Sequence, residues 1–168
     1  MNSNDYEGNL NREDEYLYPP DVLTKLEMKN CYGYLNLLSQ LTRVGDVSEE
    51  KFRETFQEMK SCKNKYYVTV IEDLSTNQVI GTATLAIEKK FIHSAGLRAR
   101  LEDVVVSNEY RGKQLGKLVV ITIRLLAEHI GCYKITLDCK DKMVKFYKQF
   151  GFTCETGNNN MMTMRFHD

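Results

Sequence analysis

A loop of basic residues and glycines is the segment of this chain whose composition most clearly suggests chemistry. Residues 111–116 stand directly before a long amphipathic stretch. The first N–H groups of a helix have no acceptor within the helix, and the dipole makes that end positive. Glycine lets the backbone approach a phosphate closely. The segment is therefore a candidate anion cradle, with a basic helix start that binds nothing as the alternative. The loop and helix start contain Arg111, Gly112, Lys113, Gln114, Leu115, Gly116 and Lys117.

Two further places carry side chains that could move a proton. Tyr147 lies in a short stretch of helical spacing that ends at Gly151. Its phenol could protonate a leaving group, or the ring could be a packing residue of the core. Glu102 and Asp103 stand directly before a run of three valines. An acidic pair beside a buried strand needs a functional reason, so both are candidate site residues.

Hydrophobic periodicity predicts the elements that must position these residues. Helical spacing indicates helices over 30–41, 52–59, 115–130 and 143–150, with Ser48 as an N-cap and Gly131 as a helix-ending C′ residue. β-branched and aromatic runs predict strands over 66–71, 79–87, 101–106, 133–138 and 161–166, with 23–28 as an optional opening strand. The first two strands form a hairpin, and the valine run predicts a strand in the middle of the sheet. The apolar face expected for the third helix comprises Leu115, Leu118, Val119, Thr122, Leu125, Leu126 and Ile130.

This order of elements predicts an α/β domain with a mixed sheet and helices on its faces. A chain of 168 residues with 42% hydrophobic content is sized for one domain, which we expect over 21–168 behind a flexible arm at 1–20. Lysine plus arginine and aspartate plus glutamate balance at 23 each, so no overall charge favours a nucleic acid or a membrane surface. Five cysteines without a Cys-x-x-Cys pair favour free thiols in the cytosol, and we expect no metal and no membrane-spanning segment.

The loop at 111–116 resembles the acetyl-CoA motif of the GNAT acetyltransferases, Arg/Gln-x-x-Gly-x-Gly/Ala. Arg111 and Gly116 match its ends, and Gln114 stands where the family usually has its middle glycine. Residues 146–152 resemble the family's late helix, Phe/Tyr-Tyr-x-x-x-Gly-Phe. In the family, the tyrosine of this helix protonates or stabilises the departing CoA thiolate. Met143 replaces an asparagine that often contacts the pantetheine.

This resemblance implies a GNAT fold, with a mostly antiparallel sheet and acetyl-CoA as co-substrate. It also implies that the strand at 101–106 splays from its neighbour and binds the pantetheine arm through its main chain. Tyr147 and Lys148 of the late helix would complete the acetyl-CoA site. The strand residues that the resemblance places at this site are Val104, Val105 and Val106.

Separate segments across 23–166 resemble the eukaryotic enzymes of this family that acetylate glucosamine 6-phosphate. The resemblance implies direct attack of the sugar amine on the thioester, in the biosynthesis of UDP-N-acetylglucosamine, by a homodimer that exchanges C-terminal strands. Tyr147 would be the general acid that protonates the departing sulfur. Glu102, or Asp138 through a water molecule, would accept the amine proton. The residues implied for the sugar phosphate are Thr42, Lys90, Phe91, Ile92, His93, Glu102, Asp103, Tyr133, Lys134 and Arg165.

Two other functions remain open from the sequence. The first is acetylation of a different amine, such as a polyamine or a protein N-terminus. The second is an acyl-CoA-binding domain without catalysis. Solvated surface charge is the alternative interpretation of Lys90, Lys134 and Arg165, because isolated lysines and arginines are mostly exposed.

Overall fold

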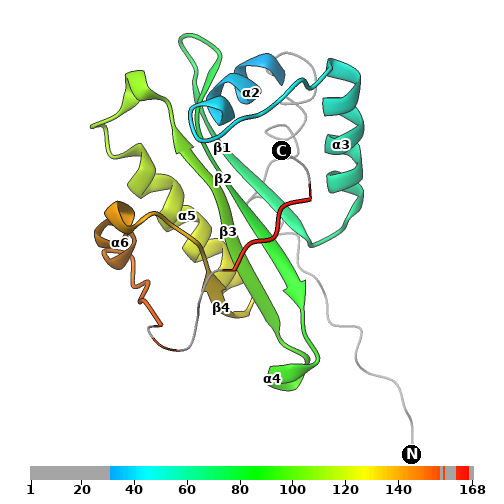
Figure 1. The fold of residues 1–168 in the computed structure, drawn as a ribbon, viewed down its shortest axis with the longest axis vertical. Helices are drawn as coiled ribbons and strands as arrows, with labels where there is room; N and C mark the ends of the chain where they lie inside the picture. Colours follow the sequence, from blue (N-terminus) through cyan, green and yellow to red (C-terminus); the bar gives the residue numbers. More distant parts are fainter. Residues whose placement is uncertain (1–30, 156, 158–161, 167–168) are drawn as a thin grey trace, which may run out of the picture.

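The computed structural model describes residues 31–155, 157 and 162–166, and these residues are built around a four-stranded sheet (Figure 1). The strands are β1 Tyr66–Asp73, β2 Gln78–Lys89, β3 Leu97–Val106 and β4 Cys132–Thr136, in the order β1-β2-β3-β4. The first two pairings are antiparallel and the pairing of β3 with β4 is parallel. The predicted mixed, mostly antiparallel sheet is therefore confirmed.

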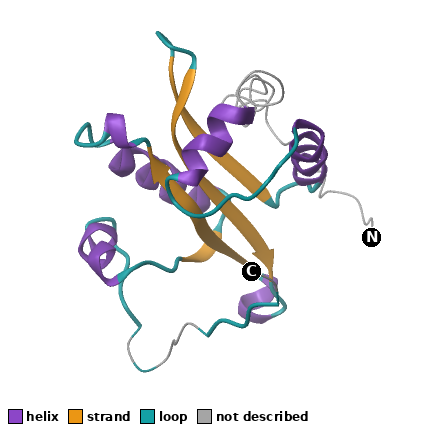
Figure 2. Cartoon of the chain, turned by 45° about the horizontal axis from the view of Figure 1, so that its top comes forward, coloured by secondary structure: helices purple, strands orange, loops and turns teal. Residues whose placement is uncertain are grey.

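Helices cover the sheet on both faces. They are α2 Cys31–Ser39, α3 Glu49–Ser61, the single turn α4 Ile92–Ala95, α5 Leu115–His129 and α6 Asp141–Lys148, with a 3₁₀ turn, η1, at Asn108–Tyr110. The predicted ends of two helices are confirmed. At the start of α3 the N–H of Lys51 donates to Ser48 Oγ at 3.1 Å, and after the end of α5 Gly131 has a φ of +83°. Figure 2 shows α2 and α3 toward one end of the sheet and α4 at the other end.

The main core lies between the sheet and the helices α5 and α6. Strand alternation turns Leu85 and Ile87 of β2 and Ala99 and Leu101 of β3 toward these helices. They pack against a set of α5 and α6 side chains, namely Val119, Val120, Ile123, Leu126, Ala127, Tyr147 and Phe150. The charged residues between them on β3 therefore lie on the opposite face of the sheet.

A second, smaller core joins the opposite face to α2 and α3. Tyr34 and Leu37 of α2 and Phe52 of α3 pack here with Val79 and Val105. Val105 reaches this face because β3 has one extra residue between the pairs Thr82↔Val105 and Thr84↔Glu102, and such a bulge reverses the alternation of side chains. The same reversal brings Val104 to the α5 side, where it packs against the main core.

The structure corrects three details of the predicted elements. Leu118 and Leu125 of α5 are about half exposed, at 54% and 51%, so the apolar face is rotated from the predicted one. Nine of the fifteen α5 residues are apolar, and the sequence therefore contains two overlapping helical patterns. Strand β4 ends at Thr136, before the predicted 138. Residues 162–166 form no strand in the described chain, whereas Met161, the opening strand at 23–28 and the arm at 1–20 lie outside the described residues.

None of the helices in the described part of the chain combines the length and the apolar character that crossing a bilayer would need.

Candidate active site

The parallel strands β3 and β4, the last two in the order of the described sheet, separate into a fork. Their pairing ends at Arg100↔Thr136, while β3 continues to Val106. Over residues 101–106 β3 pairs with β2 on one side, and no described strand pairs with the other side. The outward N–H and C=O groups of this open edge are free to bind an extended ligand, as β-strand addition does with a peptide. This is the splayed strand that the resemblance implied.

Asp103 marks the bulge on this edge. Its φ of +53° lies in the left-handed region, which is uncommon for a residue with a side chain. Partial burial, followed by the nearby charge of Glu102, raises the pKa of Asp103 above its usual value. The bulge changes the direction of the N–H groups around Asp103 and Val104 at the mouth of the fork.

The loop after β3 closes one end of the open edge. Gly112 has φ +83°, and Gln114 adopts φ 60° and ψ 15°, a left-handed conformation that a glycine would take readily. Gln114 therefore forms a left-handed turn at the position where the family usually has its middle glycine. No side chain caps α5, and its first backbone bond runs from the N–H of Leu118 to Gln114 O at 3.0 Å. The N–H groups of residues 115–117 are thus available to an anion.

Two tertiary hydrogen bonds hold this loop, and neither was predicted from the sequence. The Tyr110 hydroxyl donates to Asp73 Oδ2 at 2.6 Å, and the N–H of Asn108 donates to Gln40 Oε1 at 2.8 Å. Lys113 Nζ lies 4.7 Å from the centre of the Tyr110 ring. Hydrogen bonds from Ser75 and then from Tyr110 lower the pKa of Asp73 to about 2, so its carboxylate stays ionised and accepting at ordinary pH. The partners are 37 and 68 residues apart, and no local pattern indicates such pairs.

Gly116 lies where the loop, β3 and α6 meet. A Cβ added at this position would be 3.5 Å from Phe146 Cζ and 3.9 Å from Val106 Cγ2, which are ordinary contacts. Alanine should therefore fit, whereas the two extra methyl groups of valine would enter the space between these elements. We expect Gly116→Val to weaken acetyl-CoA binding by about tenfold or more, since overpacking costs roughly 1–3 kcal/mol.

Isothermal titration calorimetry with acetyl-CoA measures this effect, with Gly116→Ala as the matched control. The alanine variant should bind nearly as tightly as the parent chain. If Gly116→Val binds acetyl-CoA with unchanged affinity while remaining folded, the loop does not hold the cofactor.

Tyr147 combines a buried ring with an available hydroxyl. The side chain is 8% exposed, and its ring packs edge-to-face against Phe146 at 5.1 Å and Phe152 at 5.9 Å. Within the described residues the Tyr147 hydroxyl makes no hydrogen bond, and its oxygen is not fully buried. Burial, followed by the charge of Cys139, raises the pKa of Tyr147 above 10.0. At neutral pH the phenol is therefore protonated and can donate.

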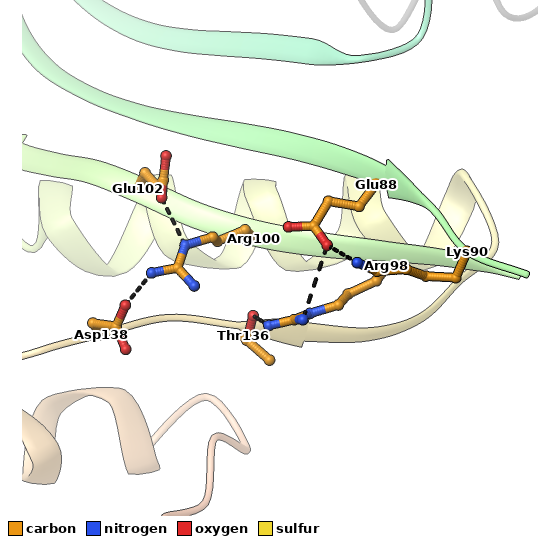
Figure 3. Close-up of polar contacts among 7 residues, drawn as sticks. All are labelled: Glu88, Lys90, Arg98, Arg100, Glu102, Thr136 and Asp138. Atoms are coloured by element: carbon orange, nitrogen blue, oxygen red, sulfur yellow. Dashed lines mark hydrogen bonds and ion pairs between the residues drawn. The ribbon is translucent and has the colours of Figure 1, made fainter. Parts of the chain in front are cut away.

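The two candidate proton acceptors share one arginine (Figure 3). Arg100 Nε donates to Glu102 Oε1 at 2.7 Å, and its Nη2 forms an ion pair with Asp138 Oδ2. The last residue of β3 that pairs with β4 is Arg100, and Glu102 lies two residues after it. Its partner on β4 is Thr136, and Asp138 lies two residues after that. The Arg100 guanidinium therefore bridges the fork. The sequence prediction omitted Arg100, although its spacing of two from Glu102 places both side chains on one strand face.

The structure brings together only part of the predicted sugar-phosphate set. The His93 ring lies 4.2 Å from that of Tyr133, and Lys90 forms an ion pair with Glu88. Phe91 and Ile92 are exposed on the turn α4, in which His93 and Ser94 are left-handed. Lys134 is exposed on β4.

Two members of the predicted set lie elsewhere in the chain. Thr42 follows α2, and Arg165 lies in the segment 162–166. Neither forms a hydrogen bond or an ion pair with the other predicted sugar-site residues within the described part of the chain. The exposed Lys117 and Lys148 lie on α5 and α6, the two helices beside the fork.

Comparison with known proteins matches this architecture. The Acetyltransferase (GNAT) family model matches residues 32–152. A relative from Drosophila melanogaster, named a probable glucosamine 6-phosphate N-acetyltransferase, is 45% identical over 93% of this chain and 84% of its own length. The glucosamine 6-phosphate N-acetyltransferase of Arabidopsis thaliana is 36% identical, over 87% of this chain and 96% of the relative.

A crystal structure of glucosamine-6-phosphate N-acetyltransferase from Arabidopsis thaliana has the same fold. It superposes with a TM-score of 0.78 at 34% identity, covering 86% of this chain and 94% of that one. The family match includes the forked strands, the loop at 111–116 and Tyr147. This protein belongs to the GNAT family of acetyltransferases.

Proposed function

We propose that this protein transfers the acetyl group of acetyl-CoA to the amine of glucosamine 6-phosphate, giving N-acetylglucosamine 6-phosphate and CoA. The observation that carries the proposal is the fork: β3 has an open edge beyond its pairing with β4, the carboxylates of Glu102 and Asp138 meet at Arg100 where the strands separate, and Tyr147 packs in the core that includes β3. Family membership supports acetyl-CoA as the acyl donor. The names of the relatives that align over most of this chain support the amino-sugar phosphate as the acceptor.

The open edge of β3 suits the pantetheine arm of acetyl-CoA. The arm is an extended chain with two amide groups, and the main-chain groups of residues 104–106 offer the complementary donors and acceptors. The pyrophosphate then meets the N–H groups at the start of α5, and Arg111, Lys113, Lys117 and Lys148 add positive charge nearby.

The transfer then proceeds in one nucleophilic step. The neutral amine attacks the thioester carbonyl, forming the C–N bond, and the N–H near Val104 stabilises the negative oxygen of the tetrahedral intermediate. The amine proton passes to Glu102, or to Asp138 through a water molecule. The C–S bond breaks, and Tyr147 donates its proton to the departing sulfur. No acyl-enzyme forms.

The sugar phosphate requires fixed cations, and we propose that two protomers supply them together. Lys90 and Lys134 come from one protomer, while Arg165 would come from its partner. The segment 162–166 supports this exchange, because Met162, Met164 and Phe166 are 91%, 77% and 80% exposed in the single chain. Such an apolar segment is expected to pair with a second sheet.

We also propose the cytosol as the site of action. All five cysteines are free thiols, and Cys62, Cys139 and Cys154 are exposed. Exposed thiols persist in a reducing compartment.

A thiol-release assay with acetyl-CoA tests the function. The amines to compare are glucosamine 6-phosphate, glucosamine, spermidine and a peptide with a free N-terminus. We expect the highest kcat/KM for glucosamine 6-phosphate and a large loss for glucosamine, which leaves the phosphate-binding cations unpaired. Preference for spermidine or the peptide would assign another amine, and thiol release with none of them would indicate a binding domain.

A further inference from the structure

The polar face of the sheet carries two clusters of charges that differ in their relation to the fork (Figure 3). In one, Arg98 Nη2 donates to Thr136 Oγ1 at 2.9 Å, and Nη1 lies 3.9 Å from Glu88 Oε2. In the other, Arg100 contacts Glu102 and Asp138. Of these two clusters, the second contains both carboxylates that are proposed to accept the amine proton.

The position of Arg100 is determined by the strand register. Arg100↔Thr136 is the last pair between β3 and β4, so the arginine stands at the point where the strands separate. Glu102 and Asp138 each follow by two residues, and the guanidinium is long enough to reach both. A guanidinium has five N–H donors in a planar fork, which allows one side chain to hold two carboxylates at once.

The contacts with Arg100 restrict the orientation of both carboxylates. A carboxylate free to rotate is poorly placed to accept the amine proton, because general-base catalysis requires hydrogen-bond distance.

We propose that Arg100 is a positioning residue of the transfer reaction: it fixes the carboxylates of Glu102 and Asp138 at the mouth of the fork. The inference rests on the proposed function for its catalytic part, although the fixed orientation of the two carboxylates concerns this chain alone. The other charged or titratable groups around the fork are Glu88 of β2, Arg98 and Asp103 of β3, and Cys139 after β4.

The structural part is tested without substrate, by crystal structures of the parent protein and of Arg100→Gln. In the variant at least one of the carboxylates of Glu102 and Asp138 should lose the orientation that it has in the parent protein. Arg98→Gln is the matched control, because it removes the same charge from the same strand face but contacts neither carboxylate. Both carboxylates should keep their orientation in this control.

The catalytic part is tested by separating kcat from KM for glucosamine 6-phosphate. In Arg100→Gln kcat should fall about tenfold or more, with a smaller change in KM, because a misplaced general base loses part of its roughly 10²- to 10⁴-fold contribution. Arg98→Gln should keep the kcat of the parent protein. Arg100→Lys should restore part of kcat, because its ammonium can still hold one of the two carboxylates.

The outcomes separate this proposal from the proposed function. Unchanged orientations of both carboxylates in Arg100→Gln overturn the role of Arg100 even if the parent protein acetylates the sugar phosphate well. A changed orientation in a protein that does not acetylate glucosamine 6-phosphate supports the positioning and rejects the function. Should Arg100→Gln not fold, Arg100→Lys decides: its ammonium cannot span both carboxylates, so one of them should still lose its orientation, and two unchanged carboxylates contradict the proposal.

Discussion

Replacement of Tyr147 by phenylalanine is expected to lower kcat by roughly a hundredfold or more, the range measured for loss of a general acid. The ring packs between Phe146 and Phe152, and the substitution leaves this packing intact. The lost hydroxyl would act only on the charge that develops at sulfur, so acetyl-CoA binding should change by less than about twofold. Single-turnover kinetics and calorimetry with acetyl-CoA measure the two quantities separately.

Tyr66→Phe is a suitable control for Tyr147→Phe. Tyr66 begins β1, the edge strand farthest from the fork in the strand order. Removal of its hydroxyl should leave kcat unchanged. If Tyr147→Phe also retains the turnover of the parent protein when chemistry limits the rate, Tyr147 is a packing residue and another group serves the thiolate.

Arg165→Ala should raise KM for glucosamine 6-phosphate by about 10- to 100-fold. A hydrogen bond to a charged group contributes roughly 1.5–3 kcal/mol, and alanine removes the guanidinium that would meet the phosphate. Steady-state kinetics at saturating acetyl-CoA measure the change. The control is Arg124→Ala, which removes an exposed arginine from α5 and should leave KM as it is. Binding of acetyl-CoA should be unaffected in both variants.

Mixed dimers test whether Arg165 serves the partner's site. Arg165→Ala subunits are combined with Glu102→Gln subunits and allowed to exchange. If Arg165 acts across the dimer, one site of each mixed dimer carries both lesions and the other is whole, so activity partly returns. If mass spectrometry shows mixed dimers without any return of activity, Arg165 acts within its own protomer or has no role at the site.

The sequence predicted the elements that depend on local patterns. Ser48 caps α3, Gly131 follows α5 in a left-handed conformation, and β1 and β2 form the predicted hairpin. Each of these features depends on a few neighbouring residues, which is why periodicity and turn chemistry were enough. The apolar face of α5 was predicted wrongly, because burial depends on which face meets the sheet.

The candidate site was predictable only in part, for a similar reason. The loop at 111–116 and Tyr147 were recognised from motifs, and the structure places Gly116 next to Phe146, the neighbour of Tyr147. The contact of Arg100 with Asp138 and the Tyr110–Asp73 hydrogen bond depend on tertiary proximity, which no local spacing reveals. The segment 162–166 was predicted as a strand from its alternation, but a strand needs a partner, and the described chain provides none.

The central claim is that acetyl-CoA lies along the open edge of β3 with its pyrophosphate at the start of α5. The most direct measurement is a titration of the ¹⁵N-labelled protein with CoA, followed through the backbone amide signals. We expect the largest shifts at residues 103–106 and 112–117, with little change in β1 at the far edge of the sheet. Shifts centred on another surface, with the amides of both segments unmoved at saturation, would contradict the account.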